Sequence, residues 1–304
     1  MKAAATLRGT LFGHPVVSDV ALRWIDHGTA TQSTLRIAVA DTTEHYRLAE
    51  SSEPTADIRR LEDGRLVAEA SGFGAYVLDA ASMTVTAPRV GARTAVWEHT
   101  LLNWAIPFLL ADTATLVLHG AAIDTGVGTM LVIGPSTRGK TTFAATAARI
   151  GYRVLGEDGI AIRCDDGGAT AFPGPPGVRL RHRADGTPGR KRASALPKGT
   201  RCQEPTRLLG VLALLDRTEL GSDVMTLSKP QAIAALRANT LAATDAMPNL
   251  YPLMASVAGF APVAKVSLRN GLEHLESEVH RLVSWTIGAS FAYKAEQHLS
   301  VSGR

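Results

Sequence analysis

The first ninety positions of the chain consist of short strand-like runs separated by turns, and polar and apolar residues alternate in one of these runs. The alternation holds over part of residues 34–40, and two further runs, residues 74–78 and 83–87, flank the turn-like residues 79–82. A period of two predicts strands, and two such runs around a short turn predict a hairpin. We therefore expect a small β-rich N-terminal domain over residues 1–92.

Between residues 95 and 110 the apolar positions change to helical spacing. Thr94 is suited to cap the start of this helix, and Pro107 is placed to bend its last turn. The stripe on one face consists of Trp97, Leu101, Trp104 and Phe108. These large side chains at helical spacing predict a packed face rather than a ligand site.

From residue 115 onward strand and helix patterns follow one another, which is typical of an α/β domain. The apolar run 208–215 predicts a strand buried on both faces of a central sheet, and residues 263–268 predict another strand. Residues 228–239 predict a capped helix with proline in its first turn. A last amphipathic helix is expected over 272–285, with inner residues Leu272, Leu275, Val279, Leu282 and Val283. We assign this α/β part to residues 93–304.

Composition gives the broad class of the protein. Of the 304 residues, 45% are hydrophobic and 20% are charged, which is ordinary for a soluble globular protein. No apolar run approaches the ~20 residues that cross a bilayer, and the first residues lack the apolar core of a signal peptide. We therefore expect a cytoplasmic protein with no membrane partner. Cys164 and Cys202 are too few for a disulfide framework, and we expect two reduced thiols.

Basic residues gather in one segment, although the formal net charge of the chain is only +4. The cluster consists of Arg179, Arg181, Arg183, Arg190, Lys191, Arg192, Lys198, Arg201 and Arg207. Such a segment could meet phosphates, an acidic peptide or nucleic acid, or it could be a surface loop with solvated charges. It has no interleaved aromatic residues, so we do not expect nucleic acid as the partner.

The strongest chemical signal lies at residues 134–141, Gly-Pro-Ser-Thr-Arg-Gly-Lys-Thr, which follow an apolar run and precede a helical pattern. Glycines allow a tight loop whose N–H groups surround phosphate, and the helix that follows adds the positive end of its dipole. This order predicts a P-loop that binds ATP, with Lys140 at the β- and γ-phosphates and the Thr141 hydroxyl on Mg²⁺. The expected nucleotide-binding residues are Gly134, Ser136, Thr137, Arg138, Gly139, Lys140, Thr141 and Thr142. The alternative is a chance glycine-rich turn.

Two adjacent carboxylates, Glu157 and Asp158, end the next strand pattern after the P-loop. Asp158 could hold Mg²⁺ directly or through water, and Glu157 could accept the proton of an attacking hydroxyl. Two solvated acids in a turn are the alternative. Upstream, His119 ends the apolar run 116–118, where a lone histidine is more often a structural residue.

Together, His119, the P-loop and the Glu157-Asp158 pair resemble the catalytic domain of HPr kinase/phosphorylase. That family has a Val-His-Gly strand, a P-loop and an Ala-Asp-Asp strand end in the same order, and the resemblance covers residues 115–165. It implies a P-loop fold related to the ATP-dependent phosphoenolpyruvate carboxykinases, and transfer of a γ-phosphate to a serine hydroxyl. Glu157 falls on the catalytic aspartate of the family, Asp158 lies near the metal, and His119 lies near the transferred phosphate. HPr kinases are hexamers, but a resemblance over residues 115–165 alone does not carry that assembly over to this chain, and the sequence leaves a homo-oligomer open.

Three departures from the family pattern bear on the substrate. Glu157 is one methylene longer than the aspartate of the family, Thr142 stands where a glutamate is common, and Phe172-Pro-Gly-Pro-Pro-Gly177 occupies the region of a Glu-Ile-Arg-Gly signature. These changes argue against HPr as the acceptor and against the reverse phosphorolysis. The Pro-Gly-Pro-Pro segment and the β-rich N-terminal part look more like the relatives that phosphorylate precursor peptides, including lasso-peptide kinases.

The sequence therefore predicts an ATP- and Mg²⁺-dependent serine kinase with a peptide or protein acceptor. Glu157, with Asp158 as the alternative, would deprotonate the acceptor, while Lys140 stabilises the transferring phosphoryl group. His119 or a basic side chain of the 179–207 segment would neutralise nearby oxygens. Two alternatives stay open: a kinase of a small hydroxylated metabolite, and a nucleotide-binding regulatory module without catalytic activity.

Overall fold

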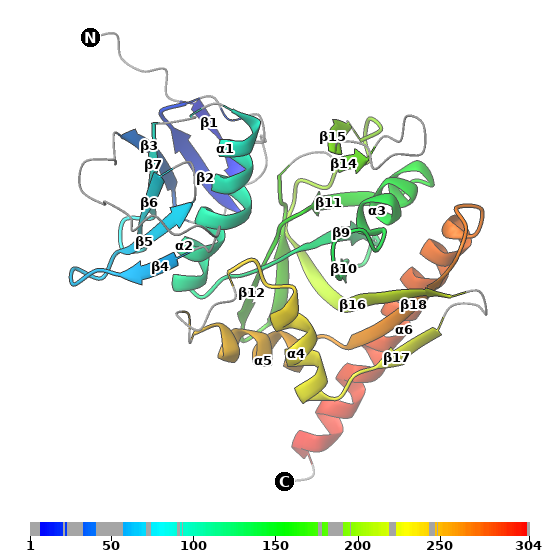
Figure 1. The fold of residues 1–304 in the computed structure, drawn as a ribbon. Coiled ribbons are helices and arrows are strands. Elements are labelled where there is room, and N and C mark those ends of the chain that lie inside the picture. The colour runs from blue at the N-terminus through cyan, green and yellow to red at the C-terminus, as the bar shows by residue number, and fades with distance from the viewer. Residues whose placement is uncertain are drawn as a thin grey trace. The chain divides into compact units, whose positions relative to one another are not determined.

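The chain is a mixed α/β protein that divides into two compact units (Figure 1). The computed structural model describes residues 7–20, 22, 33–40, 57–70, 74–89, 92, 94–175, 178–181, 191–194, 196–218, 223–242, 247 and 249–302. Contacts group residues 1–117 with 241–250, and residues 118–240 with 251–304. The first unit thus includes residues 93–117, which lie beyond the boundary placed at residue 92 from the sequence. None of the helices in the described part of the chain is long and apolar enough to span a bilayer.

The first unit contains a seven-stranded sheet in the order β1-β2-β3-β7-β6-β5-β4. Its strands are β1 (Leu7–Leu11), β2 (His14–Ser18), β3 (Leu35–Ala40), β4 (Asp57–Arg60), β5 (Leu66–Ala70), β6 (Gly74–Asp79) and β7 (Thr84–Pro88). The alternating run at 34–40 is β3, as predicted. The predicted hairpin is the antiparallel pair β6 and β7, in which Asp79 lies opposite Thr84.

Three helical segments follow where one helix was predicted: α1 (Ala95–Thr100), the π-helix η2 (Leu101–Ala105) and α2 (Ile106–Asp112). The Thr94 side chain caps α1 by accepting a hydrogen bond from the Trp97 N–H, as expected. The expectation that Pro107 bends the last turn was wrong, because Pro107 lies in the first turn of α2. Proline cannot donate within a helix and its ring crowds the preceding turn, so the wider π-helical turn lies directly before it.

The aromatic stripe on these helices packs inside the first unit, as predicted. Trp97 is fully buried and its Nε1 donates to the Pro88 carbonyl at 2.9 Å. Trp104 stands edge-on to Tyr76 and to Phe108. These contacts attach the helices to β6 and β7 of the sheet.

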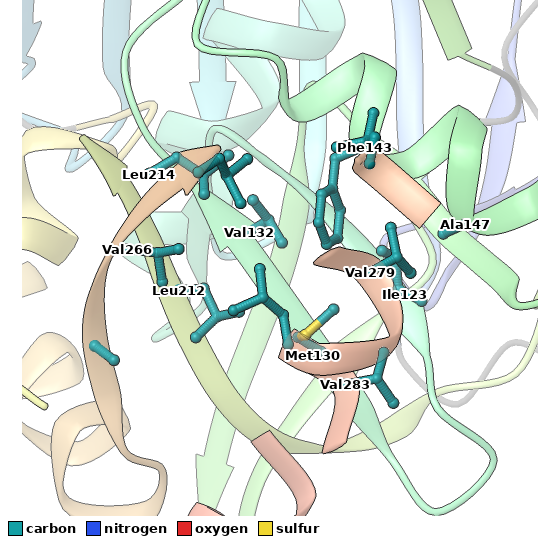
Figure 2. Close-up of a cluster of buried hydrophobic side chains, with 14 residues drawn as sticks. Ile123, Met130, Val132, Phe143, Ala147, Leu212, Leu214, Val266, Val279 and Val283 are labelled. Atoms are coloured by element: carbon teal, nitrogen blue, oxygen red, sulfur yellow. The ribbon is translucent and has the colours of Figure 1, made fainter. Parts of the chain in front are cut away.

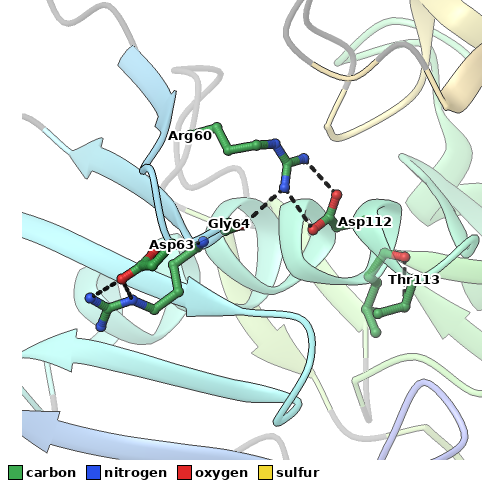
Figure 3. Close-up of polar contacts among 7 residues, drawn as sticks. Arg60, Asp63, Gly64, Asp112 and Thr113 are labelled. Atoms are coloured by element: carbon green, nitrogen blue, oxygen red, sulfur yellow. Dashed lines mark hydrogen bonds and ion pairs between the residues drawn. The ribbon is translucent and has the colours of Figure 1, made fainter.

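A second attachment joins α2 to β4 at the surface of the same unit (Figure 3). The Arg60 guanidinium donates two hydrogen bonds to the Asp112 carboxylate, at 2.7 and 3.3 Å, and a third to the Gly64 carbonyl at 3.0 Å. The carboxylate raises the pKa of Arg60, because its hydrogen bond favours the charged guanidinium. This ion pair fixes the end of α2 against the turn after β4.

The second unit is built on a nine-stranded mixed sheet. Its strands are β8 (Leu116–Leu118, of which Leu118 belongs to this unit), β9 (Gly120–Asp124), β10 (Thr129–Ile133), β11 (Arg153–Glu157), β12 (Ile160–Asp165), β13 (Gly168–Phe172), β16 (Thr206–Thr218), β17 (Asp223–Thr226) and β18 (Val263–Arg269). β16 is parallel to both β10 and β18, whereas β9 is antiparallel to β10 and β11. Residues 208–214 of β16 are buried, which agrees with the predicted central strand.

Four helices complete this part: α3 (Lys140–Arg149), α4 (Lys229–Ala238), α5 (Leu250–Phe260) and α6 (Leu275–Ser302). α3 and α6 bury their apolar faces in one cluster with β10, β16 and β18 (Figure 2). Phe143, Val279 and Leu282 are fully buried there. The predicted cap of α4 is a reciprocal capping box between Ser228 and Gln231.

The last helix differs from its predicted extent. α6 begins at Leu275 rather than 272 and continues to Ser302. Leu272, expected on the inner face, lies before the helix with 67% of its surface exposed. The reason is the turn at Gly271, which has a φ of +97° and directs the chain away before the helix starts. The other four predicted inner residues are buried.

The basic segment is described in part. β14 (Val178–Arg181) and β15 (Lys191–Ser194) form an antiparallel hairpin, and β14 contacts α3 and β11. Arg183 and Arg190 lie outside the described residues. The first strand of the hairpin therefore lies beside α3, the helix that follows the 134–141 loop.

Candidate functional site

The loop of residues 134–141 connects β10 directly to α3. Gly134, Thr137 and Gly139 have φ values of +150°, +73° and +94°. Left-handed residues set among right-handed ones are the backbone pattern of anion-binding nests. α3 begins at Lys140, so the N-terminal dipole of the helix adds to the same end of the loop. Backbone N–H groups at the start of a helix such as α3 can bind an anion.

Lys140 is folded back over this loop. Only 6% of its surface is exposed, and its Nζ donates to the carbonyls of Gly134 at 2.7 Å and Pro135 at 3.0 Å. A buried ammonium group is stable only when its donors are satisfied. The two carbonyls satisfy the ammonium group in this structure.

Thr141, in the first turn of α3, contacts the end of β11. Its hydroxyl donates a hydrogen bond to Oε1 of Glu157, whose side chain is almost fully buried. A register shift between Val154 and Gly156 interrupts the regular pairing of β11 with β9 just before this residue. The contact brings the predicted metal ligand and the predicted base together.

Asp158 follows in an unusual backbone conformation. Its φ is +71°, which is rare for a residue other than glycine, and it is 8% exposed. Oδ1 of Asp158 lies 3.9 Å from Nε2 of His119, within the range of an ion pair when the histidine is protonated. The His119 N–H donates to the Asn239 carbonyl at 2.7 Å, which holds the residue between β8 and β9. Strained residues of this kind are concentrated at functional sites.

The remaining predicted contacts lie around the loop opening. Ser136, Thr137 and Arg138 are exposed, and the Thr137 hydroxyl donates to the Ser136 carbonyl. Thr142 is half-buried in the first turn of α3. The loop therefore presents its polar side chains to solvent while Lys140 is held inside.

The oxygen donors around Thr141 suit a hard cation. Among the described residues there is no group of three or more His, Cys, Asp or Glu side chains that could hold a metal by itself. Mg²⁺ is usually bound by one or two carboxylates together with waters and the phosphates of a substrate. Thr141 and Asp158 fit that pattern, because both carry oxygen donors and Thr141 contacts Glu157, the residue before Asp158.

Gly174 and Arg201 also lie at this site. The N–H of Gly174, in the Pro-Gly-Pro-Pro segment, donates to the Leu155 carbonyl at 3.2 Å. Arg201 donates from Nη2 to the Gly174 carbonyl at 3.1 Å. The unusual proline and glycine content of residues 173–177 was the available signal for Gly174, and Arg201 belongs to the basic cluster noted in the sequence.

The two cysteines lie outside this set of residues. Cys164 and Cys202 are both free, as expected. Burial raises the pKa of Cys164 to about 11 and also raises the pKa of Cys202. Both thiols therefore stay protonated at neutral pH, which makes them poor nucleophiles.

Comparison with known proteins adds little to this geometry. No protein-family model matches the chain, and no curated protein sequence matches it. Among solved structures, the chain is similar to the HPr(Ser) kinase/phosphatase from Coxiella burnetii, with 12% sequence identity and a TM-score of 0.37 over 60% of this chain and 97% of that one. A likeness at this level carries no argument about activity. The functional argument therefore rests on the motif and on the site.

Proposed function

We propose that the chain is an ATP- and Mg²⁺-dependent kinase that transfers the γ-phosphate to a serine hydroxyl of a peptide or protein. The observation that carries the proposal is the hydrogen bond from Thr141 to Glu157. It joins the helix start that would hold a nucleotide to the carboxylates that would serve an acceptor. Neither part alone would distinguish a kinase from a nucleotide-binding module.

The 134–141 loop would hold the nucleotide phosphates. Lys140 would exchange the carbonyls of Gly134 and Pro135 for β- and γ-phosphate oxygens. Thr141 and Asp158 would hold the metal. Mg²⁺, when bound, neutralises charge on the phosphate oxygens.

Glu157 is the proposed base for the acceptor. The proton of the serine hydroxyl passes to a Glu157 carboxylate oxygen, the serine oxygen bonds to the γ-phosphorus, and the bond to the β-phosphate oxygen breaks to release ADP. Lys140 stabilises the charge on the transferring group, and His119, close to Asp158, adds positive charge when protonated. The site can supply these groups because a single short turn carries both carboxylates.

A peptide or protein acceptor is favoured over a small metabolite by the resemblance of residues 115–165 to protein-serine kinases of the HPr kinase family. The location of the basic segment supports the same choice, since β14 lies against α3 and β11. A segment rich in arginine and lysine would favour acceptors with acidic residues near the serine. We place the reaction in the cytoplasm, where ATP is available.

The test is ATP turnover with Mg²⁺ and a pool of serine-containing peptides and hydroxylated metabolites, with products identified by mass. We expect one added phosphate on a peptide serine, lost in Lys140→Ala and in Glu157→Gln. Lys229→Ala and Glu62→Gln are the matched controls, because both residues are exposed on other elements. Phosphate on a metabolite would identify a small-molecule kinase, and tight nucleotide binding without any transfer would identify a regulatory module.

A further inference from the structure

A short backbone segment after β13 presses on the turn that carries the two carboxylates. A Cβ placed on Gly174 would lie 2.2 Å from the carbonyl oxygen of Gly159, closer than any real contact. Only glycine therefore fits at residue 174. Its N–H also donates to the Leu155 carbonyl, so the segment touches the chain on both sides of Glu157 and Asp158.

The opposing backbone is equally intolerant of a side chain. A Cβ on Gly156 would lie 2.9 Å from the Gly174 nitrogen. Between these contacts Asp158 keeps a φ of +71°. A left-handed residue with a side chain costs on the order of 1–3 kcal/mol and persists only where its surroundings over-determine it. The packed Gly174 segment supplies that constraint.

Arg201 holds the segment in place from the other side. Its Nη2 donates to the Gly174 carbonyl at 3.1 Å. The Arg201 backbone forms a bridge with Val154, flanked by bonds from the Val154 N–H to the Thr200 carbonyl at 2.7 Å and from the Cys202 N–H to the Val154 carbonyl at 3.0 Å. Arg201 thus links Gly174 to β11, the strand that ends at Glu157.

We propose that Gly174 and Arg201 are positioning residues, which set the 157–158 turn so that Glu157 meets Thr141 and Asp158 can serve the metal. The inference rests on the proposed function. Gly174 bonds to the backbone of Leu155 and Arg201 bonds to the backbone of Gly174, so both act through the backbone. A displacement of about 1 Å at a catalytic group can cost roughly 100-fold in rate.

Arg201→Met removes the guanidinium donor, and Gly174→Ala separates the two backbones. For both variants we expect kcat for peptide phosphorylation to fall by about 10- to 100-fold. Arg201→Lys, which keeps one cationic donor, should recover part of the loss. The controls are Arg269→Met, at an exposed arginine of β18, and Gly259→Ala, where an added Cβ meets nothing within 4 Å.

A second measurement separates this inference from the kinase proposal. Calorimetric titration with ATP, in Mg²⁺ and in EDTA, should show that Arg201→Met loses affinity in Mg²⁺ only. If the wild type is active and Arg201→Met has the same kcat and the same ATP affinity, the positioning role is overturned and the kinase proposal stands. An inactive wild type would overturn the kinase proposal. The positioning role would then be decided by whether Arg201→Met loses ATP affinity in Mg²⁺ only. Equal losses of ATP affinity in Mg²⁺ and in EDTA would overturn the positioning role and show that Arg201 is a structural residue. If Gly174→Ala does not fold, the result for Arg201→Met decides the test.

Discussion

The Thr141 hydroxyl donates a hydrogen bond to the Glu157 carboxylate, joining the first turn of α3 to the last residue of β11. Because Glu157 is buried, this donor satisfies a charge that water hardly reaches. The same hydroxyl is the proposed Mg²⁺ ligand. Thr141 therefore connects the stability of the carboxylate turn with the binding of a metal-nucleotide complex.

Replacing Thr141 by valine keeps the shape of the side chain and removes the hydroxyl. We expect the affinity for ATP in Mg²⁺ to fall about tenfold or more, equivalent to roughly 1.4 kcal/mol, while the affinity in EDTA changes little. Calorimetric titration in the two buffers measures both values. Thr141→Ser keeps the hydroxyl and serves as the control, and an equal loss for valine in both buffers would contradict a metal-binding role.

Gly134 begins the loop with a φ of +150°, and a Cβ there would lie 2.5 Å from the Leu214 carbonyl oxygen. Gly134→Ala should therefore lower the free energy of unfolding by about 1–3 kcal/mol through strain and displacement of β16. Gly288→Ala is the control, because residue 288 is exposed on α6 with nothing within 4 Å, and alanine there should stabilise the helix by up to about 1 kcal/mol. Urea unfolding of both variants makes the comparison. Equal midpoints would show that the loop relaxes freely.

Local patterns predicted much of the second unit. The apolar run before Gly134, the glycines and the helical pattern that follows gave β10, the loop and α3 nearly to the residue. The uninterrupted apolar run of β16 identified a central strand, since a strand covered on both faces needs no alternation. These elements were predictable because the residues that determine them are neighbours in the chain.

What the sequence did not predict depends on contacts between distant residues or on a local break in a pattern. The π-helical turn before Pro107 and the exposed Leu272 both interrupt a helical period. At the site, Gly174 packs against Gly159 and Arg201 donates a hydrogen bond to the Gly174 carbonyl. These segments are distant in the sequence and meet only in the folded chain. No periodicity reports such contacts.

Phe143 on α3 is fully buried in the cluster formed with β10, β16 and α6 (Figure 2). Phe143→Ala removes most of a side chain from that core, so we expect a loss of about 3–5 kcal/mol in unfolding free energy. The matched control is Phe291→Ala on α6, where 67% of the side chain surface is exposed and the change should stay within about 0.5 kcal/mol. Urea unfolding monitored by circular dichroism gives both values. A loss of unfolding free energy for Phe143→Ala as small as that expected for Phe291→Ala would mean that α3 contributes little to the core.

Tyr76 is fully buried in the first unit, and its hydroxyl has no hydrogen-bond partner within the described ranges. Burial raises the pKa of this phenol, so the folded state keeps its proton at a pH where the unfolded chain, with a pKa near 10, has lost it. The unfolded state then binds fewer protons, and stability falls as the pH rises above about 10.

Replacing Tyr76 by phenylalanine removes both the buried hydroxyl and this titration. Tyr76→Phe should therefore be more stable than the wild type by about 1 kcal/mol at neutral pH, and the difference should widen above pH ~10. Tyr293→Phe is the opposite control, because the Tyr293 hydroxyl donates to the Ala258 carbonyl at 2.6 Å and its removal should destabilise the protein. Unfolding curves recorded from neutral to alkaline pH measure both effects. A constant difference between Tyr76→Phe and wild type across that range would show that the phenol ionises alike in the folded and unfolded chains.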